Sequence, residues 1–337
     1  MMDRHTLAAL PKLELHLHLE GAAPPAFIRD RAKRNHVDLS GLFDEQGRYR
    51  WQDFRGFLSV YDAVCTALKT PQDFHDLTLA VLENSASHGV IYTECFVSPD
   101  FCGGGDLSAW RDHLAAIDAA AQTAQAQSGI VMRAIVTCIR HNGPEQARRI
   151  AICAQETAGQ FVTGFGMAGD EAQFQPKDFI WSFDAAREAG LGLTAHAGEW
   201  AGPDAIRATL QDLRVSRIGH GVRAIEDPAV LETLAETGVV LEICPASNIA
   251  LGLYAKFPDH PVARLRDAGV KVTVSTDDPP FFGTSMTQEY GALAQCFGWG
   301  RDDFADIARI ALDAAFLDAP ARALLQNRLE EACPTPT

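Results

Sequence analysis

The stretch Leu15-His16-Leu17-His18-Leu19-Glu20-Gly21 alternates leucine with ionisable residues and then ends in a glycine. Side chains of an extended strand point alternately to opposite faces, so His16 and His18 are predicted to share one face. Two imidazoles on one face can bind a single metal ion. A His-x-His pair alone is a weak indication of a metal site, so the interpretation depends on the other polar residues of the chain.

Three later segments also place ionisable residues at the end of an apolar run. They are Leu193-Thr194-Ala195-His196-Ala197-Gly198-Glu199, Ile218-Gly219-His220-Gly221 and Val272-Thr273-Val274-Ser275-Thr276-Asp277-Asp278-Pro279. Burying an unpaired ionisable group is costly, so a core strand gains nothing from such an ending. A single buried histidine is commonly a satisfied core residue. Four such endings in one chain are better explained by a shared site.

Short apolar runs alternate with amphipathic helical stretches along the chain, which favours parallel βα units. The predicted strands lie near residues 13–19, 89–97, 131–138, 162–167, 191–196, 216–220, 239–244 and 270–276. The predicted helices are Asp73–His88, Leu107–Gln127, Pro144–Thr157, Lys177–Ala189, Pro203–Leu213, Pro228–Thr237 and Pro261–Ala268. Several of these helices begin at a proline and several end at a glycine, which are typical start and stop signals.

Eight strands in this rhythm predict an α/β fold, a (β/α)8 TIM barrel, with an extra helical segment after the first strand and C-terminal helices from Arg301 onward. An open doubly wound sheet is the alternative, but no glycine-rich dinucleotide loop follows the first strand. No linker or further repeat is evident, so residues 1–337 are assigned to a single domain. Barrel enzymes carry their chemistry at the carboxyl ends of the strands, where the polar segments fall, so these segments are predicted to converge.

The segment from residue 24 to residue 60 is too long for a plain loop between a strand and a helix. Its aromatic residues Trp51, Phe54 and Phe57, with Tyr61 just beyond, are predicted to form a helical cover beside the pocket mouth. Packing of the extra helices alone would explain the same aromatic residues equally well.

The composition is that of an ordinary globular protein. The chain has 337 residues, of which 47% are hydrophobic and 22% charged, and its formal net charge is -15. No basic stretch is present, so neither nucleic acid nor an anionic membrane is an expected partner. The sequence shows no signal-peptide pattern and no apolar run of membrane-spanning length. We therefore expect a cytoplasmic enzyme with a small-molecule substrate.

The eight cysteines show no paired spacing and lie mostly within apolar runs, which indicates small buried side chains rather than disulfides or a thiolate metal site. This observation bears on the zinc deaminases that act on bases in nucleic acids, which combine an H-x-E element with P-C-x-x-C. His18-Leu19-Glu20 fits the first element, but the second is absent from the chain. That scaffold is therefore excluded.

Imidazole and carboxylate ligands favour Zn²⁺, with an open position for a water of lowered pKa, although iron or manganese can use similar ligands. The predicted ligands are His16, His18, His196 and Asp277. Glu199 follows the third ligand by three residues and is predicted to act on the substrate as a general acid. His220 is predicted to be a base or an electrostatic partner of the metal-bound water. Asp278 must point differently from Asp277, so it is available to the substrate.

Five segments in order along the chain carry a resemblance. They are Pro11-Lys12-Leu13-Glu14-Leu15-His16-Leu17-His18-Leu19-Glu20-Gly21, Met167-Ala168-Gly169-Asp170-Glu171, His196-Ala197-Gly198-Glu199, His220-Gly221 and Ser275-Thr276-Asp277-Asp278-Pro279. In combination they resemble the adenosine/adenine deaminase family, the metal-dependent purine deaminases of the amidohydrolase superfamily. The resemblance implies a (β/α)8 barrel with one zinc ion per chain. It also implies hydrolytic loss of ammonia from carbon 6 of a purine through attack by a zinc-activated water.

The resemblance also implies a role for each site residue. It implies that His16, His18, His196 and Asp277 are the zinc ligands. His18 is also expected to contact the substrate. Glu199 becomes the proton donor to N1, His220 orients the water, and Asp277 also accepts a proton. Asp278 contacts N7. Gly169 matches a glycine whose backbone N–H contacts the purine ring, where a side chain would be unwelcome.

The identity of the substrate depends on two signals that disagree. Glu20, a predicted substrate-binding residue, stands where members acting on adenosine commonly have an aspartate that contacts the ribose 5′-hydroxyl. Glutamate there resembles the adenine-deaminase branch and some branches acting on modified nucleosides. The segment Met167-Ala168-Gly169-Asp170-Glu171 instead resembles the nucleoside-acting branch, and Cys244-Pro245-Ala246-Ser247-Asn248 does not decide. On balance the sequence favours deamination of adenosine and 2′-deoxyadenosine to inosine and 2′-deoxyinosine.

Four alternatives stay open at this point. The enzyme would convert adenine to hypoxanthine, or act on another 6-aminopurine derivative such as 6-aminodeoxyfutalosine. A metal-dependent phosphoesterase is disfavoured because no basic phosphate-binding cluster is present. A non-catalytic binding protein on the same barrel would be expected to have lost a ligand or Glu199, and neither is lost.

Overall fold

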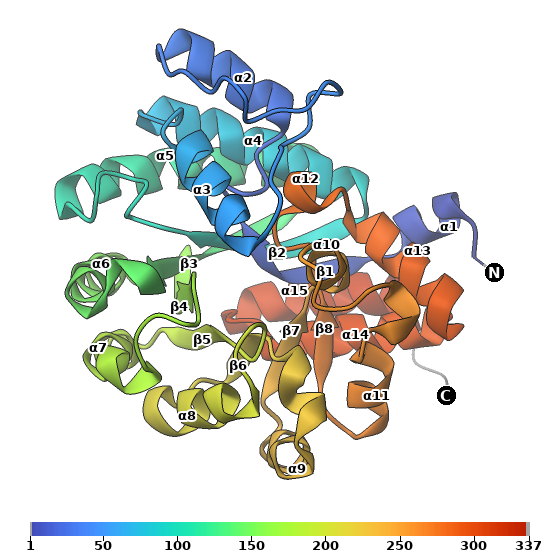
Figure 1. The fold of residues 1–337 in the computed structure, drawn as a ribbon. Helices are drawn as coiled ribbons and strands as arrows, with labels where there is room; N and C mark the ends of the chain where they lie inside the picture. Colours follow the sequence, from blue (N-terminus) through green and yellow to red (C-terminus); the bar gives the residue numbers. More distant parts are fainter. Residues whose placement is uncertain (1, 335–337) are drawn as a thin grey trace.

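Eight parallel strands form a barrel at the centre of the protein, seen in a computed structural model that describes residues 2–334 (Figure 1). Neighbouring strands pair in sequence order. The strands are β1 (Lys12–His18), β2 (Val90–Val97), β3 (Val131–Ile139), β4 (Val162–Ala168), β5 (Gly192–Ala197), β6 (Arg217–His220), β7 (Val240–Ile243) and β8 (Val272–Val274). The predicted TIM barrel is therefore confirmed, and each strand lies within two residues of its predicted bounds.

The barrel closes between β1 and β8 through backbone contacts of residues at the site. The His18 N–H donates to the Asp277 carbonyl, and the Asp277 N–H donates to the His16 carbonyl, both at 3.1 Å. The Ser275 hydroxyl oxygen accepts the N–H groups of Leu15 and His16, each at 3.2 Å. Closure thus brings the start of the chain against the segment that follows the last strand.

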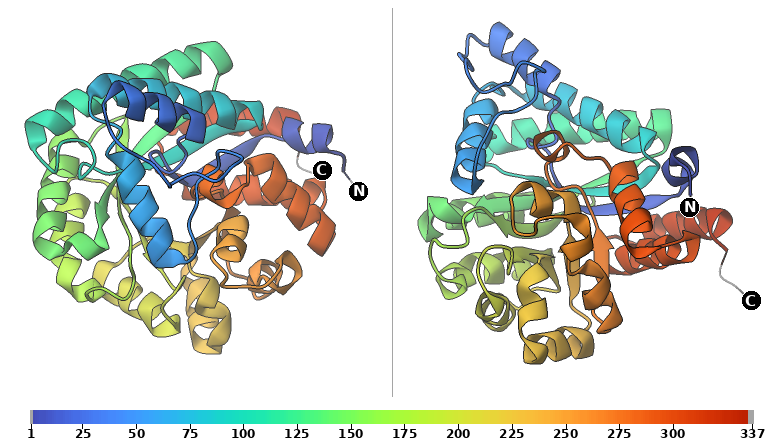
Figure 2. Two further views of the ribbon diagram at one scale, coloured as in Figure 1. Left: turned by 45° about the horizontal axis from the view of Figure 1, so that its top comes forward. Right: turned by 45° about the vertical axis from the view of Figure 1, so that its right-hand side comes forward.

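Helices surround the barrel (Figure 2). They are α1 (Arg4–Ala9), α2 (Pro25–Arg34), α3 (Phe54–Cys65), α4 (Pro71–Ser87), α5 (Leu107–Ser128), α6 (Pro144–Thr157), α7 (Ile180–Glu188), α8 (Pro203–Leu213), α9 (Pro228–Thr237), α10 (Pro245–Ala250), α11 (Val262–Asp267), α12 (Pro279–Phe282), α13 (Met286–Phe297), α14 (Arg301–Ala314) and α15 (Ala319–Ala332), with short 3-10 turns η1 (Arg140–Asn142), η2 (Pro176–Phe179), η3 (Val222–Glu226) and η4 (Phe257–Asp259). The predicted helices are present, except that 177–189 is divided between η2 and α7. Within the described part of the chain, no helix has the length and apolar character needed to cross a membrane.

The segment after β1 forms the two helices α2 and α3, and aromatic side chains of α3 and of the loop before it pack against α12. The Tyr49 ring stacks on Phe281 with centroids 4.0 Å apart, and Phe57 contacts Phe282 at 5.2 Å. Phe54 on α3 also contacts Trp200 in the loop after β5, at 4.9 Å. These contacts hold α3 beside the carboxyl ends of the strands.

Candidate active site

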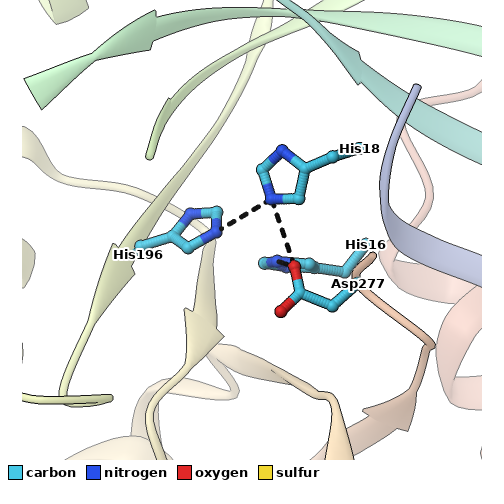
Figure 3. A group of neighbouring side chains, drawn as sticks. All are labelled: His16, His18, His196 and Asp277. Carbon is cyan, nitrogen blue, oxygen red and sulfur yellow. Dashed lines mark hydrogen bonds and ion pairs between the residues drawn. The ribbon is translucent and has the colours of Figure 1, made fainter. Parts of the chain in front are cut away.

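Four side chains from three separate regions of the barrel converge at the carboxyl ends of the strands (Figure 3). His18 Nε2 lies 3.3 Å from His196 Nε2 and 3.2 Å from Asp277 Oδ1, and His16 Nε2 lies 3.4 Å from the same oxygen. The four potential ligand atoms lie within 4.8 Å of one another. The structure therefore brings together all four residues that the sequence predicts as metal ligands.

The outer hydrogen bonds of two histidines direct their remaining nitrogens toward this cluster. His16 Nδ1 lies 2.8 Å from Glu242 Oε2, and His196 Nδ1 lies 2.9 Å from the Met167 carbonyl oxygen. His16 Nε2 is buried and has no hydrogen-bond partner. Such outer contacts fix the tautomer and orientation of metal-binding imidazoles. Three imidazoles and one carboxylate in this arrangement fit a divalent metal ion.

Gly219 on β6 makes the room that the histidine cluster needs. A Cβ atom at this position would lie 2.8 Å from His16 Cε1 and 3.1 Å from His196 Nδ1. Both distances are too short for unstrained packing of an added methyl group. A small residue is therefore needed on the strand between the ligands.

The two residues that end β6 and follow β8 have unusual backbone conformations. His220 has φ 59° and Asp277 has φ 65°, in the left-handed region that residues with a side chain rarely adopt. Such strain is typically kept where it serves a function. Here it is accompanied by a hydrogen bond from the Ser247 hydroxyl to Asp277 Oδ2, at 2.7 Å.

The loop after β5 places Glu199 at the pocket, and one carboxylate holds this loop. The Glu171 side chain accepts four backbone N–H groups of the loop, those of Gly198, Glu199, Trp200 and Ala201. Burial, with the charges of Asp277 and Glu171 nearby, raises the pKa of Glu199 well above its ordinary value. The raised pKa favours the neutral, protonated form of Glu199, which is the form that can donate a proton to a bound molecule.

Asp278 lies against Gly21, the residue that ends the opening stretch of the sequence. A Cβ atom on Gly21 would lie only 1.6 Å from Asp278 Oδ1 and 2.8 Å from Tyr61 Cε2. Asp278 Oδ1 is buried without a hydrogen-bond partner, and the residue lines the pocket. A glycine at position 21 thus leaves space for a polar group that can contact a substrate.

Glu20, which is predicted to contact the substrate, is buried beside the pocket. Its side chain is only 2% exposed, and Oε1 accepts the N–H of Ser98 at 3.3 Å. Burial raises the pKa of its carboxyl to about 7. Glu20 does not belong to the pocket lining, whereas Tyr61 from α3 does. The Glu20 carboxyl therefore lies beside Tyr61, next to the residues that line the pocket.

The pocket lies above the cluster and is covered by α3. Its lining comprises His18, Phe54, Phe57, Leu58, Tyr61, Asp62, Phe101, Ile139, His141, Ala168, Gly169, His196, Glu199, His220, Leu251, Asp277 and Asp278. Gly169 has φ 105°, and a Cβ atom there would lie 2.8 Å from His141 Nδ1. Glycine is thus required at this position both by the backbone and by the neighbouring ring.

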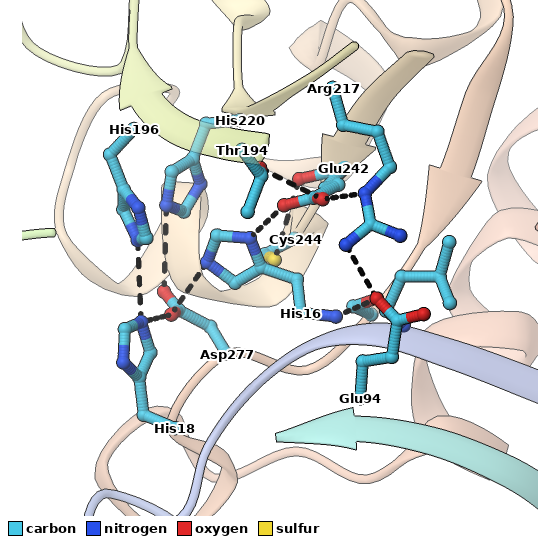
Figure 4. Close-up of polar contacts among 12 residues, drawn as sticks. His16, His18, Glu94, Thr194, His196, Arg217, His220, Glu242, Cys244 and Asp277 are labelled. Carbon is cyan, nitrogen blue, oxygen red and sulfur yellow. Dashed lines mark hydrogen bonds and ion pairs between the residues drawn. The ribbon is translucent and has the colours of Figure 1, made fainter. Parts of the chain in front are cut away.

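Glu242, which the sequence does not predict as a site residue, connects the four predicted metal ligands to a buried charge network (Figure 4). Its Oε1 pairs with Arg217 Nε at 2.7 Å, and Arg217 Nη2 pairs with Glu94 Oε2 at 2.5 Å. Burial opposes ionisation, but Arg217 and His16 hold the pKa of Glu242 below its ordinary value. No sequence signal separates Glu242 from other strand residues, because its partners are distant in the chain.

The adenosine deaminase family model matches residues 11–332. The chain belongs to the adenosine deaminase family. This deaminase is 46% identical over 321 residues to an adenine deaminase of Rhizobium rhizogenes, covering 95% of this chain and 99% of the relative. The solved structure of an adenine deaminase from Arthrobacter aurescens shares the fold, with a TM-score of 0.88, 30% identity and coverage of 96% of this chain and 99% of that one.

A third comparison concerns the metal. An amidohydrolase from Burkholderia ambifaria, solved with bound zinc, aligns with this deaminase at a TM-score of 0.86 and 25% identity, covering 97% of this chain and 92% of that one. Together with the family match, these comparisons make the protein a hydrolytic deaminase. Both relatives named adenine deaminase carry the name of a base-acting enzyme, whereas the sequence patterns of this chain predict adenosine as its substrate.

Replacing Arg217 by methionine should destabilise the fold. The substitution leaves the buried carboxylates of Glu94 and Glu242 without their cation, which typically costs about 3–5 kcal/mol. Urea denaturation would measure the free energy of unfolding. The control is Arg214→Met, since Arg214 has an exposed side chain whose ion pair with Asp184 is worth about 0–1 kcal/mol. Equal losses in the two variants would contradict this account of the network.

Replacing Gly21 by alanine should displace Asp278 without removing the metal ligands. We expect kcat/KM to fall about 10²-fold, because a shift of about 1 Å in a positioning group has an effect of this size. Steady-state kinetics and metal analysis would measure the change. Gly159→Ala is the matched control, because Gly159 is exposed and an added Cβ would contact only the Thr157 carbonyl oxygen at 4.0 Å. Full activity of Gly21→Ala would show that Asp278 can move without consequence.

Proposed function

We propose that this protein is an adenine deaminase, which converts adenine and water to hypoxanthine and ammonia. The observation that carries the proposal is the placement of Glu20, the residue at the position expected to contact a ribose hydroxyl. Its carboxyl is buried and accepts the Ser98 N–H instead of lining the pocket. A nucleoside would therefore lack this partner for its sugar. The names of the relatives support the same substrate.

The wall of the pocket supports a flat base rather than a sugar-bearing substrate. The side chains that α3 contributes include Phe54, Phe57 and Leu58, and Phe101 and Leu251 come from other elements. Apolar and aromatic surfaces pack well against a heteroaromatic ring. Tyr61, Asp62 and His141 add polar groups to the same lining. The support for a free base therefore comes from the apolar part of the wall, which offers sugar hydroxyls no hydrogen bonds.

We propose zinc as the metal, because its usual ligands are imidazole nitrogens and carboxylate oxygens. The residues that would hold it are His16, His18, His196 and Asp277. When bound, a divalent metal of this kind lowers the pKa of a water molecule toward neutrality.

The side chains around the cluster supply the other requirements of the reaction. The protonated Glu199 would donate its proton to N1 of the base, which makes C6 more electrophilic. The water oxygen forms a bond to C6, and the bond from C6 to the amino nitrogen then breaks. His220 would orient the water, and Asp277 would accept the first proton that the water loses and pass it to the leaving ammonia. The remaining proton on this oxygen would pass to the Glu199 carboxylate as the C6 carbonyl forms. Asp278 would contact N7, and the Gly169 backbone would contact the ring.

The substrate can be tested by ammonia release from a panel of compounds. We expect the metal-loaded protein to show its highest kcat/KM with adenine, above adenosine, 2′-deoxyadenosine and 6-aminodeoxyfutalosine. The expected order follows from the side chains of Phe54, Phe57 and Leu58 in the pocket wall, which pack against a base but offer no hydrogen bonds to a sugar. A higher kcat/KM with adenosine than with adenine would overturn the proposal and restore the nucleoside as substrate.

The role of Glu199 can be tested with Glu199→Gln. Glutamine keeps the size of the side chain but has no proton to donate, so kcat should fall about 10²–10⁴-fold. The metal content should be unchanged, since Glu199 is not among the four clustered ligands. Turnover at the wild-type rate by a metal-replete variant would refute the assignment.

A further inference from the structure

A chain of three buried side chains leads from the start of α11 to His220. His260 Nδ1 lies 3.2 Å from the Val262 N, and His260 Nε2 lies 3.1 Å from Asn248 Oδ1. Asn248 Nδ2 lies 3.3 Å from His220 Nδ1. The three side chains belong to residues that are at most 2% exposed, so water does not compete for these contacts.

The direction of every hydrogen bond in this chain follows from its first member. Val262 lies at the start of α11, where a backbone N–H has no partner within the helix. A backbone N–H can only donate, so His260 Nδ1 must accept, and the proton of this neutral ring is on Nε2. Nε2 then donates to Asn248, which must present its oxygen to His260. The amide group of Asn248 therefore faces His220 with its nitrogen.

The same logic assigns the proton on His220. The Asn248 NH₂ group can only donate, so His220 Nδ1 must accept, and a neutral ring then carries its proton on Nε2. His220 Nε2 lies 3.8 Å from Glu199 Oε1 and 3.9 Å from Asp277 Oδ2. These distances are too long for hydrogen bonds, and His220 lines the pocket. The Nε2–H group is therefore free to donate to a bound molecule.

We propose that Asn248 and His260 are positioning residues that hold His220 in the tautomer with hydrogen on Nε2, so that His220 donates a hydrogen bond to the attacking water. This inference rests on the proposed function for the identity of the reaction. A ring nitrogen that already carries hydrogen cannot accept the proton of that water. The proton must therefore go to another group, and Asp277 is the carboxylate beside His220.

The backbone of His220 supports the proposal independently of the hydrogen bonds. Its φ of 59° is a costly conformation for a residue with a side chain. The Asn248 contact holds one edge of the ring, and the rings of His16 and His196 lie at centroid distances of 4.9 and 5.2 Å. The ring is thus held on several sides, as expected for a donor that must be aimed at one point.

The tautomer can be observed directly by NMR of zinc-loaded protein labelled with ¹⁵N-histidine. Long-range ¹H–¹⁵N spectra distinguish protonated from unprotonated ring nitrogens, and comparison with His220→Gln identifies the His220 signals among the 11 histidines. We expect hydrogen on Nε2 and none on Nδ1. Hydrogen on Nδ1 with a bare Nε2 would overturn the proposal.

Asn248→Asp supplies a test by turnover. Aspartate has nearly the same shape but only accepts hydrogen bonds, so it would draw the His220 proton to Nδ1 and leave Nε2 bare. We expect kcat on adenine to fall about 10²-fold or more, the usual effect of losing one aimed donor. The KM should change only a few-fold, and the zinc content should match the wild type. A kcat equal to or above the wild type would show that His220 works as a base.

Two further variants serve as matched controls. Asn84→Asp adds the same charge at an exposed position of α4 and should leave kcat unchanged. His260→Gln should retain most of the turnover, because an amide can also accept the Val262 N–H and donate to Asn248. His260→Leu should lose turnover, since the Asn248 amide is then free to rotate. Equal turnover in the Gln and Leu variants would contradict the relay.

The two proposals fail separately in these experiments. Wild-type protein that does not act on adenine, but shows hydrogen on His220 Nε2, would contradict the proposed function alone. Wild-type protein that deaminates adenine with hydrogen on Nδ1 would contradict the relay alone.

Discussion

Closure of the barrel between β1 and β8 is the constraint on which the rest of the site depends. The backbone of His16 and His18 pairs with that of Asp277, so the first and last parts of the sheet are joined at the metal ligands themselves. The same hydrogen bonds that complete the fold therefore set the distances between three of the four ligands. A barrel that failed to close would lose its catalytic cluster together with its last strand pair.

Several ionisable groups at the site are buried, and two carboxylates in the wall of the barrel support the residues around them. Glu242 accepts from His16 and pairs with Arg217, while Glu171 accepts four backbone N–H groups of the loop that carries Glu199. Buried charges without partners would be strongly destabilising. The outer carboxylates thus allow a dense group of polar side chains to exist in an apolar core.

The cover over the pocket and the Glu20 carboxyl lie where the proposed choice between a base and a nucleoside would be made. In the sequence, Glu20 resembles adenine deaminases, whereas the segment around Gly169 resembles deaminases that act on nucleosides. In the structure, the Glu20 carboxyl is turned toward the Ser98 backbone, while Tyr61 from α3 lines the pocket. The Glu20 carboxyl is thus held by the backbone of Ser98, beside Tyr61.

Local sequence patterns determined the eight strands, the capped helices and the four ligands, because strand alternation and helix ends depend on neighbouring residues. The tertiary structure alone decided the orientation of Glu20, the support of Glu199 by Glu171, and the relay from His260 through Asn248 to His220. Each of these depends on hydrogen bonds between segments separated by at least a dozen residues. Such partners are chosen by how strands and loops come together in space, which no local pattern of residues contains.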